Sequence, residues 1–266
     1  MCDRFSSLKK FSGEVRDASG NVIRKIKKSE LKVTEYSDGL VSDDYYYFFE
    51  YTPSRYPITI TYEWEIKNSD GLIGYPSFLP QKNYNQSVAQ ASYRILTPAD
   101  NPCRYRTINM QAEVSQQQTA DGNWLTEVKV QSLPAIQKEP YNPALSELLP
   151  RIYFTPRNFS FEGTKGSMDN WQTYGAWQYQ LLNGRDQIPP TLKEELQRRT
   201  ANCNTTYEKI AAVYQYLAST TRYVSIQLGI GGLQPIAAAD VHRTGFGDCK
   251  GLSNYMRAML TELGIP

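Results

Sequence analysis

The chain has 266 residues, and its 29 lysines and arginines nearly balance its 27 aspartates and glutamates, which leaves a formal net charge of +2. A charge this small gives no reason to expect nucleic acid or an anionic membrane as a partner. Hydrophobic residues make up 40% of the chain and charged residues 21%, a globular and not a disordered composition. The single histidine excludes paired-histidine mechanisms and most metal sites, so the sequence predicts neither a metal nor a cofactor.

The cysteines give no sign of a zinc or redox motif. They are Cys2, Cys103, Cys203 and Cys249. Because no Cys-x-x-Cys pair occurs, zinc knuckles and thioredoxin-type motifs are excluded, whereas a disulfide between distant cysteines stays open. No run of about 18 apolar residues occurs, so no transmembrane segment is predicted. Met1–Phe5 lacks the apolar stretch of a signal peptide, which leaves a cytosolic protein and one with a removed leader both open.

Residues 1–160 carry the patterns of β-strands. The clearest strand is Ile58–Ile66, in which apolar and polar residues alternate strictly. Ser19-Gly20-Asn21 marks a hairpin near the start, and Asp121-Gly122 marks a second turn. Further candidate strands are Tyr45–Tyr51, Ser87–Thr97, Cys103–Met110, Gln111–Gln117 and Trp124–Leu133. Many short strands separated by turns predict a β-sandwich-like domain.

The periodicity becomes helical after residue 160. Helices are predicted at Ser167–Leu182, Pro190–Arg199 and Asn204–Thr220, the last with Tyr207, Ile210, Val213, Tyr214 and Leu217 on one face. A short strand at Arg222–Leu228 and a final helix from about Asp248 follow. The proline-rich stretch Pro134–Pro156 is interpreted as a linker or as the last edge of the β domain. The sequence thus predicts an α+β protein with a β-rich domain at residues 1–160 and a mainly helical one at residues 161–266.

The segment Gly247-Asp248-Cys249-Lys250-Gly251 opens the final helix. Apolar residues at helical spacing predict one buried stripe, formed by Leu252, Tyr255, Met256, Met259, Leu260 and Leu263. Cys249 precedes that stripe in the same register, so it is predicted at the helix N-terminus and on the packed face. Asp248 is the predicted N-cap, and the helix dipole favours a thiolate at Cys249. The same placement also fits a buried structural cysteine.

Three segments together carry a family resemblance. Tyr223–Pro235, then Ala239-Asp240-Val241, then Gly247-Asp248-Cys249-Lys250, resemble the transglutaminase-like superfamily, which has a papain-like cysteine fold. The chain is similar to bacterial proteins in which a β-rich domain of unknown function precedes a transglutaminase-like core. The resemblance to the core covers roughly residues 165–266, and residues 1–160 resemble the companion domain. It implies that Cys249 is the nucleophile of a cysteine-dependent amide hydrolase or acyl transferase.

The resemblance also implies a reaction. In this superfamily the thiolate attacks an amide carbonyl, of a glutamine side chain or a peptide bond, and forms a thioacyl intermediate that water hydrolyses or an amine attacks. The histidine and the aspartate that activate the thiolate follow the cysteine in the chain. Neither residue type occurs after Cys249 here. Both are therefore expected beyond Pro266, so the core is expected to be partial and this chain inactive.

Two further residues are candidates for the site. Gln234 precedes the cysteine, as oxyanion-stabilising groups do in papain-like folds, and is a candidate for oxyanion support. A loop glutamine bonded to the backbone is the alternative. His242, seven residues before Cys249, is either a substitute base or a loop histidine beside a short helix at Pro235–Arg243. The second interpretation is favoured, because the histidine of the superfamily lies on the other side of the cysteine.

Two classes of function stay open. In the first, the parent protein is an enzyme that acts on a peptide, protein or amide substrate through Cys249. In the second, the β domain recognises a peptide, glycan or partner and the transglutaminase-like part is a non-catalytic scaffold. A histidine and an aspartate on strands beyond Pro266 would favour the enzyme. Apolar surface left by a partial core is expected to stay exposed, or to be covered by a dimer or by packing on the β domain. The resemblance implies a periplasmic or cell-surface location.

Overall fold

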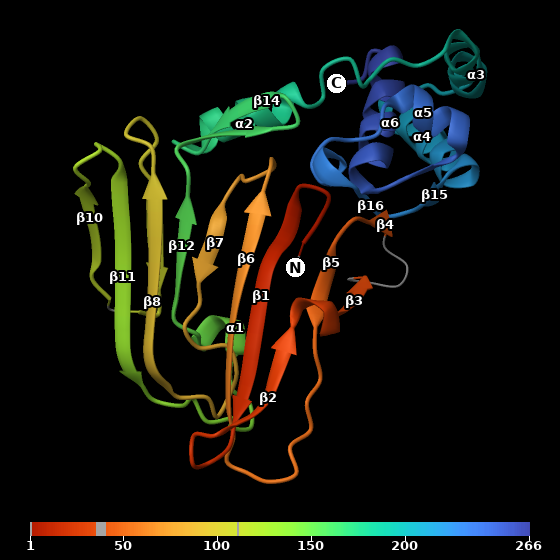
Figure 1. Cartoon of the computed structure of the whole chain (residues 1–266). Helices are drawn as coiled ribbons and strands as arrows, with labels where there is room; N and C mark the ends of the chain where they lie inside the picture. The colour runs from red at the N-terminus through yellow and green to blue at the C-terminus, as the bar shows by residue number, and fades with distance from the viewer. Residues whose placement is uncertain (1, 36–40, 111) are drawn as a thin grey trace. The chain divides into compact units, whose positions relative to one another are not determined.

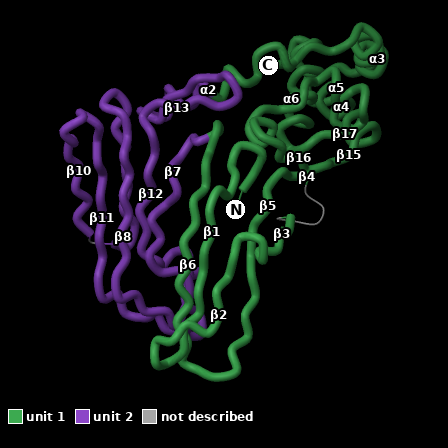
Figure 2. The backbone as a smooth tube through the Cα atoms, viewed as in Figure 1, with its two compact units in different colours: residues 1–71, 178–266 green, residues 72–177 purple. Residues whose placement is uncertain are grey.

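The computed structural model describes residues 2–35, 41–110 and 112–266. The chain forms two compact units, one of residues 1–71 and 178–266 and the other of residues 72–177 (Figure 2). Strands dominate the N-terminal part of the chain and helices the C-terminal part (Figure 1), which confirms the predicted α+β class. The predicted domain boundary at residue 160 falls inside the second unit. Compact units are defined by contacts and need not coincide with domains, so the domain boundary at residue 160 stays a prediction.

The first unit begins with a three-stranded antiparallel sheet in the order β2-β1-β6. Its strands are β1 (Ser6–Arg16), β2 (Val22–Lys27) and β6 (Thr59–Asn68). The predicted hairpin near the start is confirmed. Asp17 Oδ1 accepts hydrogen bonds from the backbone N–H groups of Ser19 and Asn21, both at 2.9 Å. Gly20 supplies a φ of +84°, which a residue with a Cβ rarely adopts, so the chain can turn back as β2.

Two smaller strand pairs belong to the same unit. After the 3-10 helix η1 (Lys28–Glu30), β3 (Lys32–Glu35) pairs antiparallel with β5 (Tyr45–Phe48). The strand β4 (Val41–Ser42) pairs in parallel with β16 (Ile226–Gln227). A strand of the N-terminal β region therefore adjoins the segment that precedes the predicted nucleophile.

The second unit contains two three-stranded sheets, in the orders β10-β11-β8 and β7-β12-β9. Their strands are β7 (Tyr75–Phe78), β8 (Val88–Thr97), β9 (Arg104–Ile108), β10 (Val114–Gln118), β11 (Trp124–Leu133) and β12 (Arg151–Thr155). Buried side chains from both sheets form one core, made of Phe78, Ile95, Cys103, Val128, Val130, Ile152 and Phe154. The alternation of buried and solvated positions along these strands is what the period-2 patterns predict.

The strand β12 corrects the interpretation of residues 134–156 as a linker or a sheet edge. It lies between β7 and β9 and is paired on both sides. Ile152 and Phe154 are 0% and 2% exposed. Pro150 and Pro156 flank the strand and do not interrupt it, so every ladder position of β12 keeps its backbone N–H. The short helix α1 (Leu145–Leu148) also lies in this stretch.

A hairpin and a helix follow β12. The hairpin consists of β13 (Asn158–Phe161) and β14 (Thr164–Ser167), and α2 (Trp171–Gln180) comes next. Asn170 Oδ1 accepts a hydrogen bond from the backbone N–H of Thr173 at 2.9 Å. This capping bond explains why the helix begins at Trp171 and not at the predicted Ser167, which is the last residue of β14.

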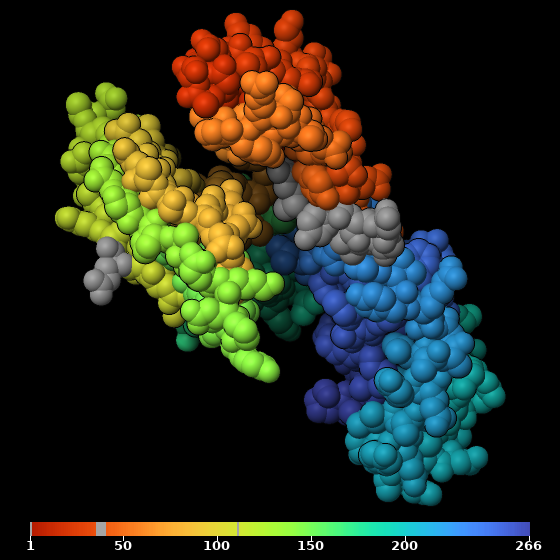
Figure 3. All heavy atoms as spheres, turned by 90° about the horizontal axis from the view of Figure 1, so that it is seen from below, coloured from red at the N-terminus to blue at the C-terminus, as the bar shows by residue number. Residues whose placement is uncertain are grey.

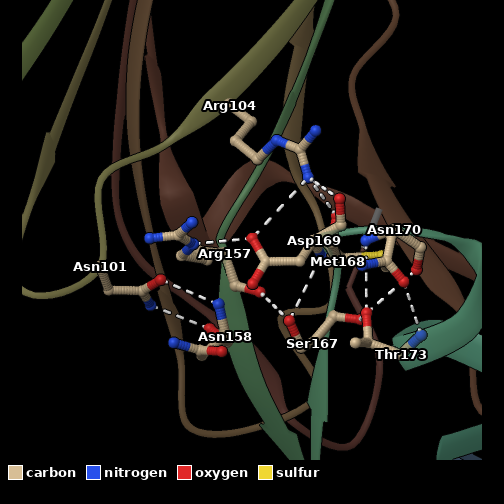
Figure 4. Close-up of polar contacts among 9 residues, drawn as sticks. All are labelled: Asn101, Arg104, Arg157, Asn158, Ser167, Met168, Asp169, Asn170 and Thr173. Atoms are coloured by element: carbon tan, nitrogen blue, oxygen red, sulfur yellow. Dashed lines mark hydrogen bonds and ion pairs between the residues drawn. The ribbon is translucent and has the colours of Figure 1, made fainter. Parts of the chain in front are cut away.

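Asp169 ties the start of α2 to the neighbouring strands (Figure 4). Its carboxylate accepts a hydrogen bond from Arg157 at 2.7 Å and lies 4.0 Å from Arg104. Arg104 also donates to the backbone carbonyls of Met168 and Asp169, at 2.6 and 2.5 Å. The hydrogen bond from Arg157 is the main reason that the pKa of the Asp169 carboxyl is lowered. These solvated ion pairs fix an orientation and contribute little to stability.

Replacing Gly166 by alanine is expected to destabilise the hairpin and the helix packed against it. A Cβ at this position would lie 2.8 Å from Phe159 Cε2 and 2.8 Å from Trp177 Cγ, closer than side chains pack. Both rings are buried and meet edge to face with centroids 4.8 Å apart. Overpacking of this kind costs about 1–3 kcal/mol. Urea denaturation followed by tryptophan fluorescence measures the loss, because Trp177 is part of the contact.

Gly175 provides the matched control on α2. A Cβ there has no neighbour within 4 Å, so Gly175→Ala is expected to stabilise the helix by up to about 1 kcal/mol. Equal unfolding free energies for the two variants would show that the Phe159 and Trp177 rings do not close over Gly166.

The remaining residues of the first unit form a helical bundle, drawn in teal to blue in Figure 3 as one closely packed body. Its helices are α3 (Pro190–Thr200), α4 (Thr206–Thr220), α5 (Ala238–Thr244) and α6 (Cys249–Glu262). They enclose a core of Leu192, Leu196, Val213, Tyr216, Ala238, Val241, Tyr255, Ala258 and Met259. Among the described residues, no helix has the length and apolar character needed to cross a membrane.

The buried face of α4 differs from the predicted one. Thr205 caps the helix, with Glu208 completing a capping box. Val213 and Tyr216 are buried, whereas Tyr207 and Tyr214 are 80% and 62% exposed. The helix contacts α3 and α6 on the side of Val213 and Tyr216, and tyrosine tolerates solvent because its hydroxyl is polar. Periodicity alone therefore selected the wrong tyrosines for the core.

Candidate active site

The helix α6 begins at the predicted nucleophile. Asp248 is its N-cap, as predicted, and its Oδ1 accepts a hydrogen bond from the backbone N–H of Gly251 at 2.9 Å. A Cβ on Gly251 would lie 3.3 Å from that oxygen, so the glycine leaves room for the carboxylate. Cys249 is consequently the first residue of the helix, where unpaired N–H groups and the helix dipole favour negative charge.

A short parallel strand pair holds the chain as it enters α6. The two strands are β15 (Arg222–Tyr223) and β17 (Phe246–Gly247). The backbone N–H groups of Arg222 and Val224 donate to the carbonyls of Gly245 and Gly247, both at 3.0 Å. Gly245 ends α5 with a φ of +70°, a left-handed conformation that glycine adopts without strain. The backbone is therefore fixed by hydrogen bonds up to the residue before Asp248.

The predicted stripe of α6 is packed, but the buried face is wider than predicted. Tyr255 and Met259 of the stripe are buried, and Leu252, Met256, Leu260 and Leu263 are partly buried and pack against the same core. Gly251, Asn254 and Ala258, which lie outside the stripe, are also buried. Since each residue turns the helix by about 100°, Cys249 lies on the side opposite the centre of the buried face. The prediction that Cys249 lies on the packed face is wrong, because Cys249 is exposed and the buried face extends from the stripe toward Gly251 and Asn254 on the other side of the helix.

The thiol of Cys249 is exposed. It differs in this from a buried cysteine of the core. All four cysteines lie in the described part of the chain and are free, with Cys2 and Cys103 buried and Cys203 half-buried. Cys103 Sγ lies 3.4 Å from the Thr126 hydroxyl, and burial raises the pKa of the Cys103 thiol. Cys249 is therefore the cysteine that a substrate can reach most directly.

The carboxylate that caps α6 is buried and paired. The side chain of Asp248 is 2% exposed, and its Oδ2 contacts the ammonium group of Lys250, whose side chain is 21% exposed. A buried carboxylate without a counter-charge would be costly. The residues on both sides of Cys249 thus form an ion pair with each other.

Gln234 lies just after the 3-10 helix η2 (Gly229–Gly232). Its Oε1 accepts a hydrogen bond from the guanidinium of Arg185 at 2.7 Å, and its Nε2 donates to the carbonyl of Leu181 at 3.3 Å. The carbonyl of Arg185 accepts a hydrogen bond from the Asn254 amide on α6 at 2.7 Å. Arg185 therefore links the Gln234 loop to the helix of the nucleophile. The oxyanion role of Gln234 stays a prediction.

His242 lies on α5, with its Nδ1 3.0 Å from the hydroxyl of Tyr255. Tyr255 is six residues after Cys249, which places it about 9 Å further along α6 and on its buried side. The short helix predicted at Pro235–Arg243 begins three residues later and ends one residue later than predicted, as α5 (Ala238–Thr244). His242 therefore lies inside this helix and not in a loop beside it, and its imidazole bonds to the buried face of α6. Its role stays a prediction.

Replacing Tyr255 by phenylalanine is expected to change stability in a pH-dependent way. Burial is the main reason that the pKa of Tyr255 is raised above its ordinary value. A raised pKa means that the folded state keeps the phenol protonated while the unfolded chain ionises, so this stabilisation is complete below about pH 10 and is lost as the pH rises further. The wild-type advantage over Tyr255→Phe, about 1–2 kcal/mol near neutral pH from the lost hydrogen bond, should shrink by about 1.4 kcal/mol at pH 11.

Urea denaturation at neutral and alkaline pH, followed by circular dichroism, measures this difference. Tyr214→Phe is the control, because Tyr214 on the neighbouring helix is 62% exposed. A constant difference between wild type and Tyr255→Phe at all pH values would contradict the role of burial.

The sequence predicts Cys249 and its cap, but it does not predict the contacts that Lys250, Arg185 and Asn254 make around them. Lys250 lies in the motif, and a lysine at a helix N-terminus is unfavourable, so its presence there could have indicated a nearby carboxylate partner. Arg185 and Asn254 are 69 residues apart. Neither lies in a motif, so only the fold shows that they meet.

Two known families match separate segments of the chain. Residues 3–137 match a family described as a domain of unknown function with solved structures, DUF3857. This match covers half of the chain. The chain belongs to the DUF3857 family. Residues 194–266, which include part of α3 and all of α4, α5 and α6, match the transglutaminase-like superfamily. The predicted combination of a β-rich domain of unknown function with a transglutaminase-like core is therefore confirmed.

A solved structure supports the same architecture for this DUF3857 protein. A crystal structure from Parabacteroides distasonis, described as that of a candidate protease, superimposes with a TM-score of 0.67 at 17% sequence identity. The match covers 98% of this chain and 50% of that one, so this chain spans about half the length of its structural relative. At this identity the likeness concerns the fold. No curated protein matches the chain.

Proposed function

We propose that this DUF3857 protein is a cysteine-dependent amide hydrolase or acyl transferase in which Cys249 is the nucleophile. The observation that carries the proposal is an exposed thiol on the first residue of a capped helix, inside a segment that matches the transglutaminase-like core. Exposure allows contact with a substrate, and the helix terminus favours the thiolate over the thiol.

In the proposed reaction the thiolate of Cys249 attacks the carbonyl carbon of an amide. The carbonyl π electrons move to oxygen, and the tetrahedral intermediate collapses with expulsion of the amine, which takes up a proton. The resulting thioester is cleaved by water to a carboxylic acid or by a second amine to a new amide. Both reactions release the thiol of Cys249.

The base is proposed to come from residues outside this sequence. The one imidazole of the sequence, His242, is bonded to Tyr255. No histidine or aspartate follows Cys249, whereas the resemblance implies that both residues follow the nucleophile. Gln234 is proposed as oxyanion support, since it stands upstream of Cys249 in a loop that Arg185 links to α6.

The proposed substrate is a peptide, a protein or another amide. Support for a peptide comes from the candidate protease that shares the fold. The proposed location is the periplasm or the cell surface, which cell fractionation with immunoblotting tests.

Trapping of the acyl intermediate tests the proposed function. The protein at its full natural length is incubated with casein, or with a glutamine-containing peptide and a primary amine, and quenched in acid. Peptide mass spectrometry is expected to find the acyl group on Cys249, and hydroxylamine is expected to remove it because it cleaves thioesters. Turnover with acylation at another residue, or with no adduct at all, would contradict the proposal.

A further inference from the structure

The ion pair around Cys249 has a direct consequence for the thiol. Asp248 immediately precedes Cys249 in the chain, so a buried negative charge belongs to the residue next to the one that carries the thiol. The carboxylate is 2% exposed, so water screens its charge less than it would screen a surface carboxylate. The cap that α6 needs therefore works against the nucleophile that α6 carries.

Lys250 removes this conflict. Its ammonium contacts Asp248 Oδ2, while Oδ1 of the same carboxylate accepts the capping bond from Gly251 at 2.9 Å. The positive end of the helix dipole disfavours a lysine in the first turn, so the ion pair accounts for its presence. Oδ1 of Asp248 thus caps the helix, and Oδ2 pairs with the ammonium group of Lys250.

We propose that Lys250 is a positioning residue for Cys249 and keeps its thiolate reactive by neutralising the buried carboxylate of Asp248. The inference rests on the proposed function of Cys249 for its biological meaning. The chemistry itself concerns only the reactivity of the thiol, so it can be measured without a substrate.

The experiment measures alkylation of the wild-type chain and its variants by iodoacetamide at pH 7. Mass spectrometry of peptides gives the rate at each cysteine, and half-buried Cys203 is the internal reference. Lys250→Met is expected to slow alkylation of Cys249 by about tenfold relative to Cys203, because it leaves the carboxylate uncompensated. Lys250→Arg, which keeps the charge, is expected to stay within about twofold of wild type.

Asp248→Asn separates this electrostatic effect from a structural one. The amide oxygen can still accept the capping bond, and removal of the negative charge is expected to speed alkylation several-fold. In the Asp248→Asn background, Lys250→Met is expected to change the rate far less than it does in wild type. This background also keeps the test valid if Lys250→Met alone folds poorly.

Lys193→Met is the matched control. Lys193 forms an ion pair with Glu262 at 2.7 Å, at the opposite end of α6 and about 20 Å from Cys249, and its loss is expected to leave the alkylation rate unchanged. An unchanged or faster rate in Lys250→Met, or an equal slowing in the Asp248→Asn background, would overturn the inference. If Lys250 behaves as expected but Cys249 is never acylated during turnover, only the proposed function fails.

Discussion

Replacing Cys249 by alanine is expected to abolish turnover of amide substrates by the protein at its full natural length, with a loss of about 10⁴-fold or more in kcat. The reason is that covalent catalysis has no second route once its nucleophile is removed, and the remaining groups can only bind the substrate and stabilise an oxyanion. Release of peptides from casein and incorporation of a fluorescent amine into a glutamine peptide measure hydrolysis and transfer separately.

Cys203→Ala is the matched control for this loss. Cys203 is half-buried and free, and it lies in the same helical bundle after α3, so its replacement is expected to leave turnover unchanged. Turnover that survives in Cys249→Ala would point instead to a scaffold role for α6.

Local patterns predicted the fold where one short segment carries all the information. The hairpin at Gly20 depends on the φ of one glycine and on the side chain of Asp17, and both act within the turn itself. The helix N-termini at Pro190 and Cys249 were predicted for the same reason. Signals of this kind need no tertiary contact to be read.

Predictions failed where tertiary packing decides between alternatives. Prolines suggested a linker at residues 134–156, but the segment between Pro150 and Pro156 is free of proline and becomes the central strand β12. Whether a short apolar segment is an edge or a centre depends on which strands flank it, and those strands are distant in the sequence.

The same limit applies to the helix that carries the nucleophile. Its apolar stripe is packed, with Tyr255 and Met259 buried and its other members partly buried. The core also takes in Asn254, whose amide donates to the carbonyl of Arg185. From the sequence alone, a polar residue such as Asn254 is predicted to lie on the surface, because the distant backbone group to which it hydrogen-bonds is not visible there. The position of Cys249 at the helix start was therefore predictable, and its orientation was not.

Replacing Met259 by alanine is expected to cost the first unit about 2–5 kcal/mol of unfolding free energy. Met259 is 0% exposed and belongs to the core in which α6 packs against α3 and α4. Truncation would remove buried apolar contacts and leave a cavity, because leucines on α3 and the backbone of three helices hold the surrounding shape. Urea denaturation followed by circular dichroism measures the effect, since helices supply most of the signal of this bundle.

Met256→Ala is the matched control, one turn earlier on the same helix and only partly buried. Both substitutions remove the same atoms and change helix propensity equally, so the difference between their unfolding free energies isolates burial. Met259→Ala is expected to be clearly the more destabilising of the two. The opposite order would mean that the side of α6 that carries Met256 is packed more tightly than the side that carries Met259, which would contradict the complete burial of Met259 in this core.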